Sequence, residues 1–207
     1  TSMGTATVLL NLAKPTITMR FFSIEARYVV GSLFGDDTKR IKVVDRAQRT
    51  EVGVAEFVPL LCERCVVGSL MGVEEHRLGR WERIIRSAAE QSRRGRLPRL
   101  APVTMWPLAL QRARRTDISL VPWEEARGLS LSQVLQGQQA TAGGAKQGRP
   151  FSLSVFIGPE GGLTAEEIHL ARSMDVHVVT LGPRVLRAET AGLVVASAIL
   201  YALGDLE

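Results

Sequence analysis

The stretch Phe156–Glu167, FIGPEGGLTAEE, has the residue types of a turn that holds a small ligand. An apolar run ends at Ile157, and Gly158, Pro159, Glu160, Gly161 and Gly162 follow before the start of a helix. Glycine lets the backbone approach a bound molecule closely, because it has no Cβ. The stretch predicts a ligand-binding turn, in which Glu160 either faces the ligand or only shapes the backbone.

Two further turns carry glycine or proline and charged residues. The first is VPWEE (121–125), and the second is LGPRVLRAETA (181–191), which leads into an apolar helix. In the second turn, Arg187 and Glu189 are the groups that could act on a reacting atom. Glu189 has an alternative role as an anion near the amino end of the last helix, where it would stabilise the helix dipole.

Several common kinds of site are absent from the sequence. There is no G-x-G-x-x-G dinucleotide motif, no G-x-x-x-x-G-K-[ST] phosphate loop and no G-x-S-x-G elbow. Cys62 and Cys65 form a lone C-x-x-C, and the three histidines are scattered along the chain, so we expect no metal site. The two cysteines are interpreted as reduced thiols near a strand end, with a thioredoxin-like redox pair as the alternative.

The pattern of elements explains how these turns could meet. Four apolar runs resemble strands, at 55–67, 117–126, 151–158 and 176–182. Three helical patterns alternate with them, at 80–94, 163–174 and 189–203. Thr164 and Glu167 have capping-box spacing. We expect the last helix to bury Ala191, Val194, Val195, Ala198, Ile199 and Ala202. Such alternation indicates an α/β fold with a parallel sheet and helices on both faces. Ligands bind at the carboxyl ends of such strands, where all three turns lie.

Arginine is concentrated in one part of the chain. Residues 77–115 contain eleven arginines and no lysine, and their only acidic residues are Glu82 and Glu90. The helical pattern at 80–94 places Trp81, Ile84, Ile85 and Ala88 on one face, with arginines on the other. Clustered guanidinium groups match phosphate oxygens. The segment is interpreted as a phosphate-binding surface, with a solvated helix face as the alternative.

Length and composition suit a globular chain with a substantial core, since 45% of the 207 residues are apolar. No apolar run reaches the roughly 18 residues of a membrane span, and the amino-terminal residues lack the features of a signal peptide. We expect a soluble cytoplasmic protein with no membrane contact. The stretch Gly137–Pro150 is small, polar and rich in glycine, which predicts a flexible loop.

The motifs IGPEGGLTAEE and LGPRVLRAETA, in this order and before an apolar terminal helix, resemble the ribosomal RNA small subunit methyltransferase E family. TEVGVAEFVPLLCERCVV (50–67) and RWERIIRSAAEQSRRGRLP (80–98) are similar to two further stretches of that family. The resemblance covers about residues 45–207. It implies a SPOUT-type parallel sheet with a carboxyl-terminal trefoil knot, a homodimer, and S-adenosylmethionine as methyl donor to N3 of a uridine in small-subunit ribosomal RNA.

The resemblance also implies roles for individual residues. Arg187 and Glu189 would be catalytic, with Arg187 stabilising the uracil anion. Arg184 would bind the cofactor, with a surface or dimer salt bridge as its alternative. The cofactor-binding set is Val121, Pro122, Trp123, Ile157, Gly158, Pro159, Glu160, Gly161, Gly162, Leu181, Gly182, Arg184, Leu186, Thr190 and Ala191. The RNA-binding set is Arg86, Arg93, Arg94 and Arg96. No metal is implied.

The sequence departs from the family before residue 45, where members usually carry a β-rich RNA-binding domain of about seventy residues. Residues 1–44 are interpreted either as a remnant of that domain, through MRFFSIEARYVVGSLFGDDTKRIKVV (19–44), or as a first strand at 8–15 followed by an insertion. Residues 45–207 are the expected methyltransferase domain. Two alternative functions remain open: a SPOUT methyltransferase with a different RNA target, and a non-catalytic RNA-binding protein of ribosome assembly.

Overall fold

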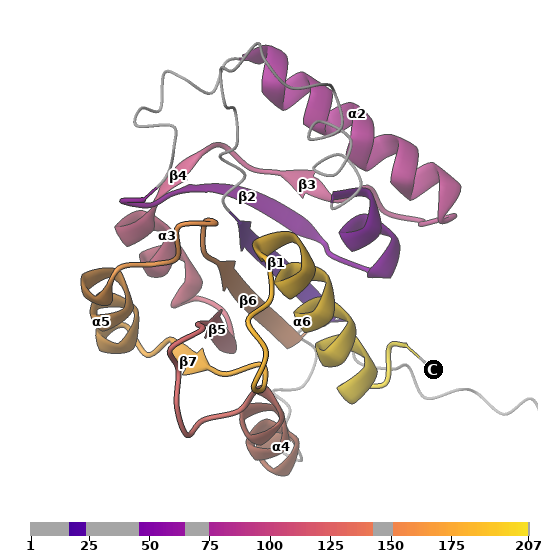
Figure 1. Ribbon diagram of the computed structural model, residues 1–207. Helices are drawn as coiled ribbons and strands as arrows, with labels where there is room; N and C mark the ends of the chain where they lie inside the picture. The colour runs from indigo at the N-terminus through magenta and orange to yellow at the C-terminus, as the bar shows by residue number, and fades with distance from the viewer. Residues whose placement is uncertain (1–16, 24–45, 65–74, 143–150, 207) are drawn as a thin grey trace, which may run out of the picture.

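A computed structural model describes residues 17–23, 46–64, 75–142 and 151–206 of the chain. Its centre is a seven-stranded sheet in which every strand pairing is parallel (Figure 1). The strand order is β3-β2-β1-β6-β5-β7, and β4 pairs with β2. The strands are β1 Ile17–Ser23, β2 Glu56–Leu61, β3 Arg99–Leu100, β4 Thr104–Met105, β5 Ile118–Pro122, β6 Phe151–Ile157 and β7 His177–Val179.

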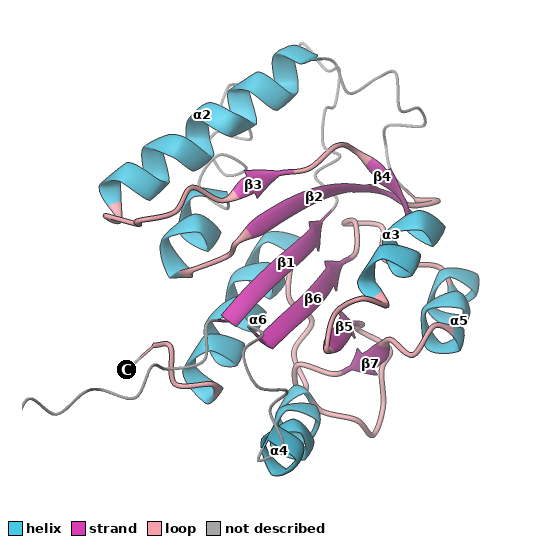
Figure 2. Ribbon diagram, turned by 180° about the vertical axis from the view of Figure 1, so that it is seen from behind, coloured by secondary structure: helices cyan, strands magenta, loops and turns pink. Residues whose placement is uncertain are grey.

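Helices lie on both faces of this sheet, as Figures 1 and 2 show from opposite sides. The helices are α2 Glu75–Gln91, α3 Trp106–Ala113, α4 Leu131–Ala142, α5 Ala165–Ser173 and α6 Ala188–Ala202, and residues 46–52 are also helical. The predicted α/β class with a parallel sheet is confirmed. Among the described residues, no helix is both long enough and apolar enough to cross a membrane.

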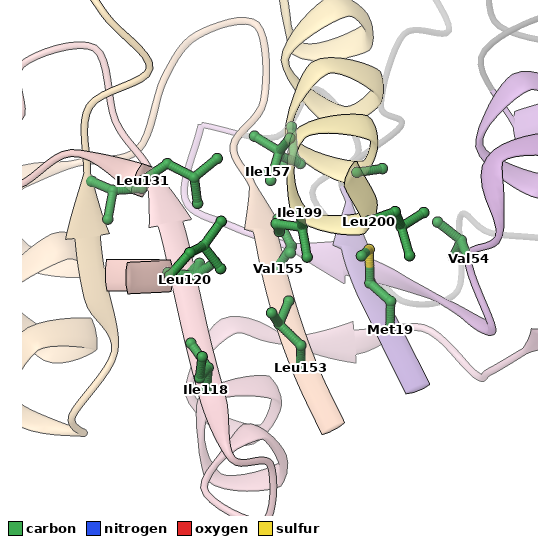
Figure 3. Close-up of a cluster of buried hydrophobic side chains, with 14 of the residues drawn as sticks. Met19, Val54, Ile118, Leu120, Leu131, Leu153, Val155, Ile157, Ile199 and Leu200 are labelled. Carbon is green, nitrogen blue, oxygen red and sulfur yellow. The ribbon is translucent and has the colours of Figure 1, made fainter. Parts of the chain in front are cut away.

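Two apolar clusters, one on each face, hold the helices to the sheet. Met19, Val155 and Ile199 belong to the first cluster, which joins α6 and α4 to the strands (Figure 3). Phe156 and Trp106 belong to the second, on the side of α3 and α5, with ring centroids 5.4 Å apart. Val155 and Phe156 are neighbours in β6 and serve opposite faces, because strand side chains alternate. This is why β6 is apolar at five of its seven positions and not only at every second one.

The strands and helices expected from the pattern are present, with shifts at their ends. The predicted helix at 163–174 is α5, and Thr164 caps it: the Thr164 hydroxyl accepts from the Glu167 backbone N–H, and the Glu167 carboxylate accepts from the Thr164 N–H. The prediction of a flexible loop at 137–150 is wrong for residues 137–142, because α4 continues to Ala142. Leu131, Val134 and Leu135 bury one face of α4, and this packing outweighs the weak helix propensity of glycine. Residues 143–150 lie outside the described part.

In α6 and α2, the burial of individual residues differs from what the apolar pattern alone suggests. In α6, Val195 and Ile199 are buried, and Ala191, Ala198 and Ala202 are half-buried, but Val194 is 41% exposed. The prediction that Val194 is buried is therefore wrong, because it lies about 100° around the helix from Val195. In α2, Ile85 and Ala88 are buried, and Trp81 and Ile84 are only partly covered.

The sheet extends on both sides of the boundary expected at residue 45. β1 lies between β2 and β6, with Arg20 opposite both Glu56 and Ser154. Residues 17–23 are thus part of the same parallel sheet as the rest of the fold. The expected first strand at 8–15 and residues 24–45 lie outside the described residues.

Candidate active site

The three predicted turns follow three neighbouring strands. β6, β5 and β7 are adjacent and parallel, so the turns at 158–162, 121–125 and 181–187 leave the sheet at the same edge. The Trp123 N–H donates to the Val179 carbonyl over 3.0 Å, which joins the turn after β5 to the end of β7. The half-buried Trp123 side chain packs against the second cluster. The edge where ligands bind in such sheets therefore carries all three turns.

The turn after β6 has the geometry that its glycines allow. The Gly162 N–H donates to the Pro159 carbonyl over 2.9 Å, and Gly162 has a φ of +72°, where other residues are strained. A Cβ on Gly158 would lie 3.0 Å from Cγ of Leu163. Ile157 and Pro159 are buried, whereas Glu160 and Gly161 are exposed. The middle of the turn is therefore exposed to solvent, while the residues that lead into it are buried.

The turn after β7 is more exposed to solvent than the turn after β6. Gly182 has a φ of +109°, and its N–H donates to the Thr180 hydroxyl over 3.2 Å. Leu181 and Leu186 are half-buried, and Arg184 is exposed. The two leucines can therefore offer apolar surface to a ligand, as a cofactor pocket requires.

Arg187 and Glu189 stand at the start of α6. Arg187 is the N-cap residue, and its Nη1 lies 4.0 Å from Oε1 of Glu189. The Arg187 side chain is 82% exposed and that of Glu189 is 31% exposed. Thr190 is exposed and Ala191 is half-buried in the same turn of helix. Glu189 can therefore orient Arg187 and also lie favourably in the helix dipole.

The four arginines expected to bind RNA do not share one environment. Arg86, Arg93 and Arg96 are exposed. The guanidinium of Arg94 instead donates to the carbonyls of Thr50 (2.8 Å), Val54 (2.7 Å) and Gly53 (3.3 Å). Burial lowers the pKa of Arg94, and the charge of Asp205 opposes that shift. Arg94 is a structural residue, and the sequence could not show this because its acceptors lie at least 40 residues away.

Two further charged groups, which the sequence did not identify as site residues, lie at the same edge. Arg64 follows β2, and its Nη1 donates to the Gly161 carbonyl over 3.0 Å. A Cβ on Gly162 would lie 3.1 Å from Oε1 of Glu124, in the turn after β5. Both residues directly follow the carboxyl end of a strand, which is the signal that could have identified them. Cys62 is half-buried in the same segment, and Cys65 lies outside the described residues. Within the described ranges, no three His, Cys, Asp or Glu side chains gather as a metal site would need.

Comparison with known proteins identifies relatives of this chain. It is 36% identical over 152 residues to the ribosomal RNA small subunit methyltransferase E of Bacillus subtilis, covering 73% of this chain and 57% of that protein. It is 34% identical over 154 residues to the protein of the same name from Mycobacterium bovis, covering 72% of this chain and 54% of that protein. The chain thus spans little more than half the length of these curated relatives.

A solved structure shares the fold. The crystal structure of a ribosomal RNA small subunit methyltransferase E from Neisseria gonorrhoeae, bound to S-adenosyl methionine, superimposes with a TM-score of 0.67 at 24% identity. The match covers 93% of this chain and 69% of that one. The family resemblance inferred from the motifs is confirmed by these relatives. The RNA methyltransferase domain model matches residues 39–200, and the chain belongs to that family.

Proposed function

We propose that this chain transfers a methyl group from S-adenosylmethionine to N3 of a uridine in small-subunit ribosomal RNA. The observation that carries the proposal is the meeting of the turns after β5, β6 and β7 at one edge of the sheet, in a chain of the RNA methyltransferase family. The names of the relatives support the ribosomal RNA substrate. The bound cofactor of the Neisseria structure supports the methyl donor.

The residues at this edge fit the proposed cofactor. A Cβ on Gly158 would lie 3.0 Å from Leu163, and one on Gly162 would lie 3.1 Å from Glu124, so the turn needs glycine at both positions to keep its shape. Leu181 and Leu186 would enclose the adenine ring, and backbone groups of the turn at 158–162 would bind its polar edges. The remaining proposed contacts come from the same three turns: Val121, Pro122, Trp123, Ile157, Pro159, Glu160, Gly161, Gly182, Arg184, Thr190 and Ala191.

The reaction needs positioning and charge stabilisation. When bound, S-adenosylmethionine would supply an electrophilic methyl group, and the broken S–CH3 bond would release neutral S-adenosylhomocysteine, which needs no metal to leave. Uracil N3 must lose its proton to form the bond, so negative charge develops on the imide. Arg187 would stabilise that charge, since its exposed guanidinium stands at the start of α6, directly after the turn that follows β7. Glu189, whose Oε1 lies 4.0 Å from Nη1 of Arg187, would orient Arg187 or the uracil base.

The proposed RNA surface combines Arg86 of α2 with exposed arginines of the segment that follows the helix. Arg86, Arg93 and Arg96 project from this part of the chain, which ends in β3. Arg99 in β3 is 71% exposed and lies 3.7 Å from the Glu56 carboxylate, which also pairs with Arg20 and Arg112. Three guanidinium groups around one carboxylate leave an excess of positive charge, which favours a phosphate backbone.

Three further features belong to the proposal. The chain forms a homodimer through the outer face of α6 and the turn before it, since Val185, Val194 and Tyr201 are 75%, 41% and 73% exposed. Val194 and Tyr201 are seven residues apart and share a helix face. The segment from β7 to α6 forms the trefoil knot of the SPOUT fold. The protein acts in the cytoplasm on ribosomal RNA or the small subunit.

Methyl transfer to isolated small ribosomal subunits that lack their native modification tests the function. Labelled S-adenosylmethionine is supplied, and the modified nucleoside is identified after digestion. We expect N3-methyluridine. Cofactor binding without transfer to these subunits would favour a different RNA target or a binding protein. An absence of cofactor binding at millimolar concentration would refute both enzyme functions.

A further inference from the structure

The segment after β2 reaches the turn after β6, although these strands are not neighbours. β1 lies between β2 and β6 in the sheet. The Glu63 N–H nevertheless donates to Oε1 of Glu167 over 2.8 Å, and Arg64 Nη1 donates to the Gly161 carbonyl over 3.0 Å. These contacts join residues 104 and 97 positions apart in the sequence. A fourth loop therefore meets the turn at 158–162 and the start of α5.

A buried carboxylate fixes the base of this segment. The Glu167 side chain belongs to a residue only 8% exposed, and both of its oxygens accept hydrogen bonds. Oε1 accepts from the Glu63 N–H, and Oε2 accepts from the Thr164 N–H over 2.9 Å. The Glu167 carbonyl accepts from Nε1 of Trp106 over 3.1 Å. Arg64 therefore extends from a backbone that is already held in place at Glu63.

The side chains of Arg64 and Glu124 lie close to Gly161 and Gly162 of the turn. A Cβ on Gly161 would lie 3.4 Å from the Arg64 Cβ, and one on Gly162 would lie 3.9 Å from Arg64 Nη1 and 3.1 Å from Glu124 Oε1. A cation from the loop after β2 and an anion from the loop after β5 thus flank the same dipeptide. Glycine in the turn permits both approaches.

We propose that Arg64 is a positioning residue, which holds the Gly161–Gly162 peptide in the orientation that binds the cofactor. This inference rests on the proposed function. Glycine has more backbone freedom than any other residue, so an unrestrained turn with two glycines would lose that freedom on binding. The hydrogen bond from Arg64 restrains the turn before the cofactor arrives, and such preorganisation increases affinity.

Binding of the product S-adenosylhomocysteine to the full chain, measured by titration calorimetry, tests this role. Arg64→Ala is compared with Arg64→Lys and with Arg83→Ala. Arg83 is a matched control, because it is also exposed and its Nε donates to a glycine carbonyl, that of Gly79, over 3.3 Å. We expect roughly tenfold weaker binding for Arg64→Ala, because the backbone of about one residue would then have to be ordered on binding instead of before it. Arg64→Lys should recover part of the affinity, and Arg83→Ala should bind as the unaltered chain does.

Kinetics separate positioning from a general structural role. In Arg64→Ala the KM for the cofactor should rise by about the same factor, and the KM for RNA and kcat should change less than about twofold. Unchanged product affinity in Arg64→Ala would overturn the proposal, and so would a rise confined to the KM for RNA. If Arg64→Ala does not fold, Arg64→Met, which keeps the apolar stem without a donor, replaces it, and product affinity equal to that of the unaltered chain again overturns the proposal. If the unaltered chain binds no product, the proposed function itself fails.

Discussion

Replacement of Arg94 by alanine should destabilise the fold, although its neighbours in the sequence face solvent. Its guanidinium donates to three backbone carbonyls, those of Thr50, Gly53 and Val54, at 2.7–3.3 Å. These bonds tie the end of α2 to the chain just before β2. Arg94 lies outside the helix, three residues after its end, and the alanine variant removes all three hydrogen bonds.

The size of the effect follows from these bonds. A hydrogen bond to a charged group contributes about 1.5–3 kcal/mol. The three bonds share one guanidinium, and water can reach some of the acceptors in the variant. We therefore expect a loss of about 2–4 kcal/mol in the free energy of unfolding. For a domain of this size, each kcal/mol lowers Tm by about 2–4 °C, so Tm should fall by about 4–16 °C.

Thermal and urea unfolding of Arg94→Ala, with Arg96→Ala as the matched control, measures this loss. Arg96 is exposed and lies two residues away, so its replacement should leave Tm within about 1 °C, since such surface changes cost little. RNA affinity should show the opposite order, with the larger loss in Arg96→Ala. Equal Tm values for the two variants, or a larger loss of RNA affinity in folded Arg94→Ala, would refute the assignment.

Three further variants test the remaining parts of the site. Arg187→Ala should lower kcat by about 10²–10³, as expected for one group that stabilises a developing anion, and should leave product affinity nearly unchanged; turnover at the original rate would contradict its role. Arg93→Glu combined with Arg96→Glu should weaken RNA binding and reduce the slope of log K against log salt by about two, and an unaltered slope would exclude this surface. Gly162→Ala should cost about 1–3 kcal/mol of stability, because φ is +72° there, and should weaken cofactor binding. Gly79→Ala in α2, where a Cβ meets nothing within 4 Å, is its control, and equal unfolding midpoints would contradict the strain.

The sequence was sufficient for features that depend on local chemistry. Apolar runs in β5 and β6 indicated strands buried on both faces, and the spacing of Thr164 and Glu167 indicated the cap of α5. Glycine indicated the turns at 162 and 182, and both glycines have a positive φ in the structure. These features are readable because each depends on residues a few positions apart.

Tertiary structure decided which residues meet and what each charge does. Arg94 and Arg96 look alike in the sequence, but only Arg94 finds backbone acceptors more than 40 residues away. Arg64 contacts Gly161 only because the loop after β2 passes over β1 to reach the turn after β6. The order of strands in a parallel sheet is fixed by packing between distant segments, so local pattern determined the turns and their glycines, and the fold alone determined which charged side chains surround them.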